Sequence, residues 1–324
     1  MPTVAPLDLD SYCVAARFLA DVPVFALADG TVHRLDHGHQ TTGAHDGLLT
    51  ADVAQDGRTL LTGGEDGRVV AHLADGAMTV LAEIGMKWIG QIAAGPSASV
   101  AFSSGRTAYV RQAESALRTF ACPRTVEGLA FAPKGLRIAI ARYNGVTLHW
   151  AGMGAKPTEL EWKGSHTGVT FSPDGKFLVT TMQENALHGW RMADNHDMRM
   201  SGYPAKVKSL SWSAKGKWLA SSGAPAAIVW PFSGKDGPMG KAPMELGTRA
   251  DALVTIVACH PREDMVAIGF NDGMILASRF SDQKEVLLRR PGNGAISSLS
   301  WNKAGTQLAF GSEAGDCGVV DITA

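Results

Sequence analysis

The chain has 324 residues, of which 45% are hydrophobic, and its 30 basic and 31 acidic side chains leave a formal net charge of −1. This balance does not favour binding to a nucleic-acid backbone, which usually requires a basic surplus. The sequence contains no run of about 18 or more apolar residues, the length needed to span a bilayer. The start MPTVAPLDLD lacks the features of a secretory signal. The four cysteines form no C-x-x-C pair, so we expect a reduced, cytoplasmic protein.

One unit recurs along the chain, and residues 168–190 show it most clearly. The sequence GVTFSPDGKFLVTTMQENALHGW predicts a strand ending at Phe171, a tight turn at Ser172 to Gly175, a second strand KFLVTTM and a third strand ALHGW. In chain order, relatives of this unit cover residues 15–35, 50–73, 91–110, 128–150, 168–190, 209–230, 256–280 and 298–322. The first, third and seventh copies are the weakest. A period of about 40 residues indicates a repeat architecture.

The residue that closes the first strand sets the period. It falls at Phe18, Val53, about Ala93, Phe131, Phe171, Trp212, Cys259 and Trp301. The longest gap contains the Gly- and Pro-rich segment 233–243, which we expect to be a surface loop.

Asp-Gly pairs mark the turns between strands. They occur at residues 56–57, 66–67, 174–175 and 272–273, and glycine supplies the positive φ that tight hairpins need. No segment shows convincing helical periodicity. A single hairpin unit is marginal in water, but units arranged radially bury both faces and leave only short edges. The sequence therefore predicts an all-β chain.

The S-P-D-G turn, the Asp-Gly turns and the third-strand tryptophans Trp150, Trp190 and Trp230 resemble the WD-repeat family, over nearly the whole chain. The resemblance implies a single closed β-propeller domain over residues 1–324. It also implies a buried hydrogen-bond network that joins a histidine before each repeat to the hairpin aspartate. Only the second copy has both residues, His45 and Asp66, so we expect the other blades to be held mainly by packing.

Eight copies predict eight four-stranded blades, and seven blades, the commoner number in the family, is the alternative. Seven would require the weak third copy to be irregular. The last copy leaves no room for a fourth strand. Because propellers of this family commonly close with an N-terminal strand, we expect residues 3–9 to supply the outer strand of the last blade.

The resemblance also implies a binding face, formed by the loops before the first strands and the turns between second and third strands. Exposed aromatic residues and arginine dominate interface energy. On this face we place candidate partner-binding residues Lys87, Trp88, Glu127, Arg142, Tyr143, Gln183, Lys206, Arg249 and Phe270. Trp88 and Phe270 have an alternative interpretation as packing residues.

A second hypothesis concerns histidines. In the segment HRLDHGHQTTGAHDG, His37 and His39 are candidate metal ligands, since histidine with carboxylate binds zinc. No spacing there matches a recognised site, and a solvated polar connection explains the segment as well. Cys259 and His260 are not expected to form a nucleophilic pair, because adjacent strand residues point to opposite faces.

We expect a non-catalytic scaffold or adaptor that binds a protein or peptide partner, requires no cofactor and is a monomer. No G-x-S-x-G, phosphate loop or dinucleotide motif is present. A metal-handling accessory protein is the alternative, and a propeller enzyme with a central site is a third possibility that the apolar inner strands disfavour.

Overall fold

The computed structural model describes residues 3–112 and 115–323, and the regular elements in these ranges are all β-strands. In this part of the chain, no helix is long and apolar enough to cross a membrane. Contacts divide the chain into two compact units. One contains the segments up to Thr42 and from Gly202 onward, and the other runs from Gly43 to Ser201. The expectation of one domain over residues 1–324 stays a prediction.

The unit from Gly43 to Ser201 contains three antiparallel sheets. The first has four strands in chain order, which are β6 (Leu48–Val53), β7 (Thr59–Gly64), β8 (Arg68–Leu73) and β9 (Met78–Glu83). The second has β10 (Gln91–Ala94), β11 (Ser99–Ser104), β12 (Thr107–Gln112) and β13 (Arg118–Ala121). The third has six strands, which are β14 (Gly128–Phe131), β15 (Arg137–Trp150), β16 (Thr158–Phe171), β17 (Phe177–Met182), β18 (Leu187–Arg191) and β19 (His196–Met200).

The other unit contains four sheets of four strands each. The first has β2 (Cys13–Leu19), β3 (Val22–Leu27), β4 (Thr31–Leu35) and β5 (His39–Gly43). The next has β20 (Leu210–Trp212), β21 (Trp218–Ser221), β22 (Ala227–Pro231) and β23 (Met244–Leu246). A third has β24 (Val254–Cys259), β25 (Met265–Phe270), β26 (Ile275–Arg279) and β27 (Glu285–Arg289). The last has β28 (Ile296–Trp301), β29 (Gln307–Ser312), β30 (Asp316–Asp321) and β1 (Thr3–Asp8).

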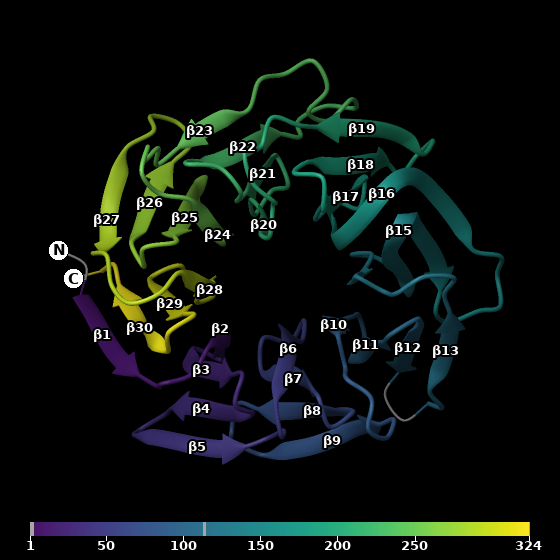
Figure 1. Cartoon of the computed structure of the whole chain (residues 1–324), viewed down its shortest axis with the longest axis horizontal. Helices are drawn as coiled ribbons and strands as arrows, with labels where there is room; N and C mark the ends of the chain where they lie inside the picture. Colours follow the sequence, from purple (N-terminus) through teal and green to yellow (C-terminus); the bar gives the residue numbers. More distant parts are fainter. Residues whose placement is uncertain (1–2, 113–114, 324) are drawn as a thin grey trace. The chain divides into compact units, whose positions relative to one another are not determined.

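The N-terminal strand completes the sheet of the last repeat, as expected from residues 3–9. β1 pairs antiparallel with β30 from Thr3 opposite Asp321 to Asp8 opposite Asp316. Figure 1 shows the purple β1 beside the yellow β30. The two ends of the sequence are therefore joined by a ladder of backbone hydrogen bonds.

The expectation of eight separate four-stranded blades is wrong, because the described residues form seven sheets. The alternative of seven blades assumed an irregular third copy, but the third copy forms a regular four-stranded sheet. Instead, copies four and five share the six-stranded sheet. β15 and β16 are each 14 residues long. β16 pairs with β15 as far as Ser165, opposite Tyr143, and from His166 onward it pairs with β17. Two ladders thus meet on one continuous strand.

The Asp-Gly turns have the predicted conformation. Gly57, Gly67, Gly175 and Gly273 all have positive φ, between 66° and 81°. At Gly67 the requirement is strict, because an added Cβ would lie 1.8 Å from the backbone oxygen of Gly85. Clusters of buried aliphatic and aromatic side chains join successive sheets within each unit, and another cluster joins the two halves of the six-stranded sheet.

Candidate functional site

Antiparallel order puts two kinds of segment at the same end of each sheet: the segment that enters the first strand, and the turn between the second and third strands. We call this end the entry edge. In the unit from Gly43 to Ser201 it carries the segment 84–89 before β10, the bend 143–145 within β15, the segment 162–165 within β16 and the turn after β17. The residues predicted to bind partners in this unit all lie here.

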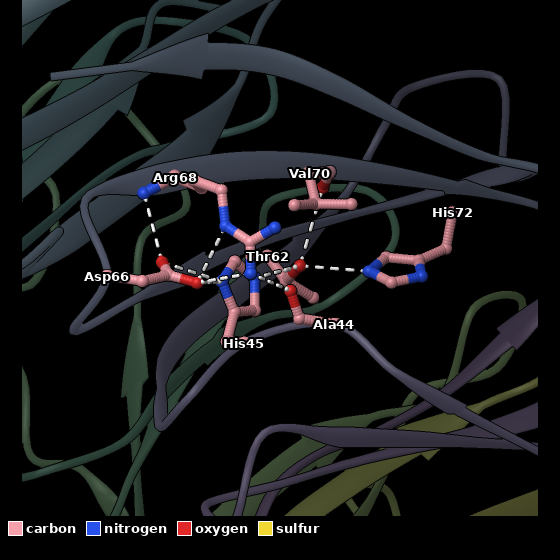
Figure 2. A network of polar contacts seen from close by, with 7 residues as sticks. All are labelled: Ala44, His45, Thr62, Asp66, Arg68, Val70 and His72. Carbon is pink, nitrogen blue, oxygen red and sulfur yellow. Dashed lines mark hydrogen bonds and ion pairs between the residues drawn. The ribbon is translucent and has the colours of Figure 1, made fainter. Parts of the chain in front are cut away.

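A buried polar network fixes the entry edge of the first sheet in this unit (Figure 2). His45 Nδ1 lies 3.0 Å from Asp66 Oδ1, and His45 Nε2 lies 2.8 Å from Thr62 Oγ1. Thr62 Oγ1 is in turn 2.9 Å from Nε2 of His72. Arg68 completes the network, because its Nε donates to Asp66 and its Nη2 donates to the carbonyl of Ala44.

The chemistry of the groups sets the direction of these hydrogen bonds. The Asp66 carboxylate only accepts, so His45 Nδ1 donates to it and His45 Nε2 accepts from the Thr62 hydroxyl. Thr62 Oγ1 then accepts from His72 Nε2. Burial lowers the pKa of His45, an effect that the Asp66 hydrogen bond partly offsets. Burial, and to a lesser extent His45, lowers the pKa of His72 to about 4, so both rings are neutral at pH 7.

The network holds a loop that presents two exposed apolar side chains. Ile84 N–H donates to Gly67 O, and Ile89 N–H donates to Gly64 O, so the segment 84–89 is tied to the turn that contains Asp66. From this segment Met86 is 88% exposed and Trp88 is 63% exposed. Lys87 between them is exposed as well. Trp88 is therefore a surface residue and not a packing residue, and its part in partner binding stays a prediction.

Two adjoining hollows lie on the entry edge of the six-stranded sheet. The larger, of about 590 Å³, is lined by Arg142, Tyr143, Asn144, Glu161, Trp162 and Lys163. The smaller, of about 330 Å³, is lined by Tyr143, Trp162, Lys163, Gly164, Met182, Glu184, Ala186 and Arg199. Tyr143, Trp162 and Lys163 are common to both, and Tyr143 is 46% exposed. We call the two hollows together the Tyr143–Trp162 surface.

The ring of Trp162 rests on a buried histidine. Trp162 stacks on His188 with the ring centroids 4.0 Å apart and an interplanar angle of 18°. His188 is fully buried, and neither of its ring nitrogens has a hydrogen-bond partner among the described residues. Burial, with a smaller contribution from His166, lowers the pKa of His188 to about 3. A neutral, flat ring therefore forms the support for Trp162.

Hydrogen bonds fix the segments around these aromatic rings. His166 Nδ1 and Thr180 Oγ1 are 2.8 Å apart, and His166 Nε2 donates to the carbonyl of Trp162 at 3.1 Å. On the other side, Ser165 N–H donates to Glu184 Oε1 at 3.2 Å. The surface is thus preformed, which reduces the entropy lost when a partner binds.

The prediction that Arg142 is an exposed contact residue is wrong, because its side chain supports this surface from inside. Its Nη1 donates to the carbonyl of Tyr143, Nε donates to Thr147, and Nη2 donates to Glu159. Its side chain is largely buried by these contacts. Of the other candidates in this unit, Gln183 is exposed, and Glu127 is half-buried at the start of β14.

In the other unit, the assignment of Phe270 to a binding surface is wrong, because its side chain is completely buried. It packs in the core with residues of β21 and β22. The guanidinium of Arg249 lies 5.0 Å from its ring centroid and donates to Asp272 Oδ2 at 2.8 Å. Arg249 thus covers Phe270 and has its own carboxylate partner. Lys206 is half-buried.

Trp150 does not occupy the position of Trp190 and Trp230. Ala151 N–H donates to Leu136 O, just as Met192 N–H donates to Lys176 O in the next repeat, so His149 is the counterpart of Trp190. Trp190 and Trp230 are buried, whereas Trp150 is 37% exposed. The turn between the second and third strands is one residue shorter in the fourth copy, and this moves Trp150 to the opposite face.

Buried polar networks also exist in other repeats, in addition to the packing that was expected to be their main support. Besides the His166–Thr180 pair, Trp230 Nε1 donates to the Tyr203 hydroxyl at 2.7 Å, and this hydroxyl lies 2.6 Å from Ser221 Oγ. Tyr203 thus takes the part that histidine plays in the second copy. A search for histidine and aspartate alone could not find it.

The histidine-rich segment does not gather metal ligands. His37 is 98% exposed, with Asp36 as its neighbour at 3.6 Å, while His39 lies 2.8 Å from Nδ1 of His33 instead. Within residues 3–112 and 115–323, no group of three or more His, Cys, Asp or Glu side chains could hold a metal ion. Cys259 and His260 have separate partners, as their strand positions predict: Cys259 Sγ donates to Ser211 O, and His260 Nε2 donates to Gly305 O.

Sequence reasoning missed Trp162, Lys163 and Arg199. Trp162 and Lys163 directly precede the Gly-Ser-His segment that enters the fifth copy, so their place in the repeat was a usable signal. Arg199 lies on the outermost strand β19 and reaches this edge only through the folded sheet.

Comparisons with known proteins agree with this architecture. Residues 257–324 match the family model described as the anaphase-promoting complex subunit 4 WD40 domain. WD repeat-containing protein 1-B of Xenopus laevis is 35% identical over 80 residues, which are 24% of this chain and 13% of that protein. The chain therefore corresponds to a small part of that relative.

Two solved structures are similar over almost the whole chain. The computationally designed Ika8 protein has a TM-score of 0.78 at 19% identity, covering 97% of this chain and 98% of that one. The C-terminal WD40 domain of Sif2 has a TM-score of 0.76 at 14% identity, covering 99% and 98%. At these identities the likeness concerns the fold. The solved structures agree with the repeats on a β-propeller fold, and the two sequence matches, each over part of the chain, support the resemblance to the WD-repeat family.

Proposed function

We propose that this WD-repeat β-propeller is a non-catalytic scaffold that binds a protein partner through the Tyr143–Trp162 surface. Propellers of this type generally serve as protein-interaction scaffolds. The observation that carries the proposal is the convergence of Tyr143, Trp162 and Lys163 on two adjoining hollows. Exposed aromatic rings in preformed hollows are the residues on which interface energy concentrates.

The charges at this surface indicate the character of the partner. Lys163 and Arg199 line the smaller hollow, and neither has a salt bridge or side-chain hydrogen bond among the described residues. Glu184 accepts from the Ser165 N–H and keeps its negative charge, and the exposed Glu161 adds a carboxylate to the larger hollow. Arg142 is neutralised by Glu159. A segment with an apolar residue next to an acidic one would place its apolar side chain on Tyr143 and Trp162 and its carboxylate near Lys163 and Arg199.

The experiment compares affinity capture by the wild-type protein and by variants of this surface. Tyr143→Ser removes an aromatic anchor, and Lys163→Glu with Arg199→Glu reverses the two cations without disturbing a buried group. Trp150→Ala is the control, because Trp150 is an exposed aromatic residue at the opposite end of the same sheet. All variants are first checked for an unchanged circular dichroism spectrum.

We expect proteins captured by the wild type and by Trp150→Ala to be lost with Tyr143→Ser and with the double charge reversal. Retention of the same proteins by all four would contradict the proposal. Loss only with Trp150→Ala would place the binding surface at the opposite end of the sheet.

A further inference from the structure

The residue that ends the first strand of a copy fills a slot against the preceding sheet. In the unit from Gly43 to Ser201, Phe131 packs into the core of β10–β13, and Phe171 packs into the core of β14–β16. The clusters that hold these two rings contain small and aliphatic side chains of the preceding strands: Ala93, Ala101 and Val110 with Phe131, and Ala139, Leu148 and Leu160 with Phe171. Within this chain, aromatic rings are therefore the usual occupants of the slot.

Ala94 holds the same position in the third copy, where the sequence had indicated about Ala93. Its backbone N–H donates to Asp52 Oδ2 at 2.8 Å, and Asp52 is the penultimate residue of the preceding first strand. In the same way, Cys259 N–H donates to Ser211 Oγ at 2.8 Å, and Ser211 precedes Trp212. This shared hydrogen bond shows that Ala94 is the counterpart of Cys259 and hence of Phe131 and Phe171.

Because alanine has no ring, the slot before β10 is open. Ala94 packs against the cluster of Leu61, Ala71 and Leu81, and beside it a cavity of about 440 Å³ lies between this cluster and the turn 95–99, within the size range of small-molecule pockets. Its apolar floor consists of Leu61, Ala71 and Leu81 from β7, β8 and β9. Leu61 pairs with Asp52, as Ala101 pairs with Ala93 in the next sheet. Because leucine is larger than alanine, Leu61 fills part of the space beside Ala94. No side chain of residues 3–112 or 115–323 takes up the remaining volume.

A small residue at this position does not by itself leave a cavity. Cys259 has the same place in the other unit, and there Trp218 and Phe280 join the cluster around it, with their ring centroids 5.9 Å apart. Among the described residues, no aromatic side chain lines the cavity beside Ala94.

The rim of the cavity is rigid and offers hydrogen-bond acceptors. Gly95 N–H donates to Ser99 O at 2.8 Å, which closes the turn between β10 and β11. Ser99 Oγ donates to Pro96 O at 2.6 Å, and Thr59 Oγ1 donates to Asp56 Oδ2 at 3.2 Å. Since both hydroxyl protons are used, the two oxygens keep lone pairs for a donor on a ligand.

We propose that this slot binds a small aromatic molecule of one or two fused rings that carries a hydrogen-bond donor, such as an indole or a phenol. The chain contains an example of this arrangement. Trp301 belongs to the core cluster that includes Ala267 and Ala277, and its indole Nε1 donates to Ala258 O at 3.0 Å. The slot lies at the turn between first and second strands, opposite the entry edge. It is thus separate from the Tyr143–Trp162 surface and independent of the proposed scaffold function.

The test is a titration of the full chain with indole, followed by NMR of methyl-labelled alanine and leucine. Saturable shifts are expected at Leu61, Ala71 and Leu81. Ala94→Phe should fill the slot and weaken binding by about tenfold or more. Ala121→Phe adds the same ring to an exposed position on β13 and should leave binding unchanged. If Ala94→Phe does not fold, Ala94→Phe with Leu61→Ala reproduces the pairing of Phe131 with Ala101.

A parallel titration with N-acetyl-tryptophanamide distinguishes a free ring from a side chain. We expect much weaker binding than for indole, because the backbone groups have no matching partners in the slot. Equal binding of the two probes would identify the slot as a receptor for a polypeptide side chain and overturn the small-molecule assignment. Absence of saturable binding, or binding that survives Ala94→Phe, would overturn the site itself.

Discussion

Replacing His72 by glutamine tests the buried network through the response of stability to pH. His72 is buried, and burial lowers its pKa to about 4 in the folded protein. In an unfolded chain a histidine titrates near pH 6.5. Between these two values the unfolded state binds more protons than the folded state. Stability from the neutral ring is therefore complete above about pH 6.5, and it is lost as the pH falls toward 4.

The linkage relation gives the size of the effect. For one histidine with these two pKa values, the free energy of unfolding falls by about 2 kcal/mol between pH 7 and pH 5. Burial also lowers the pKa of His45 and of His188, so the wild-type protein should lose more than this. Glutamine does not titrate in this range, and its amide can still donate to Thr62 Oγ1.

The assay is urea unfolding followed by circular dichroism at pH 7, 6 and 5. His72→Gln should reduce the loss of unfolding free energy between pH 7 and 5 by about 2 kcal/mol. His37→Gln serves as the control, because the His37 side chain is 98% exposed. A pH dependence for His72→Gln that matches the wild type would refute the assignment of a neutral, buried His72.

Further variants test the packing and the reactivity of single side chains. Gly67→Ala forces a Cβ toward Gly85 O in a left-handed conformation, and thermal melts should show a loss of about 1–3 kcal/mol or more. Phe270→Ala should cost about 3–5 kcal/mol in urea unfolding, whereas Trp88→Ala should change stability by less than about 0.5 kcal/mol. Burial raises the pKa of the Cys259 thiol to about 12. We therefore expect Cys259 to react with iodoacetamide at pH 8 only after unfolding. Mass spectrometry should find Cys259 unmodified in the folded protein and alkylated in the unfolded protein.

The sequence predicted strands and turns well because both depend on local patterns. Asp-Gly pairs report a positive φ directly, and Gly57 and Gly273 have it. The strand supplied by residues 3–9 followed from the missing strand of the last copy, and its pairing with β30 agrees. Asp66 and His45 could be paired from their places in the repeat, and they lie in hydrogen-bond contact.

Errors arose where a position depends on the exact length of a turn. Trp150 and Trp190 stand at equal distances from Phe131 and Phe171 in the sequence, but one residue fewer in the turn reverses the face of Trp150. For the same reason, the sequence could not show that β15 and β16 would continue without interruption and merge two copies.

Burial of single side chains was the other limit. Phe270 and Trp88 are both aromatic residues near the entry edge, yet one is completely buried and the other is exposed. The side chain of Arg142 is held away from solvent by a salt bridge to Glu159, which lies on another strand. Such differences depend on contacts between strands that no single-sequence pattern contains.

Site-specific photo-crosslinking in cells tests the proposed binding surface most directly. A benzophenone amino acid is placed at position 143 or, as the control, at position 150. The account predicts a discrete protein adduct from position 143 that is absent from position 150 and is lost when Lys163 and Arg199 are changed to glutamate. Identical adducts from both positions, or adducts that persist after the charge reversal, would contradict it.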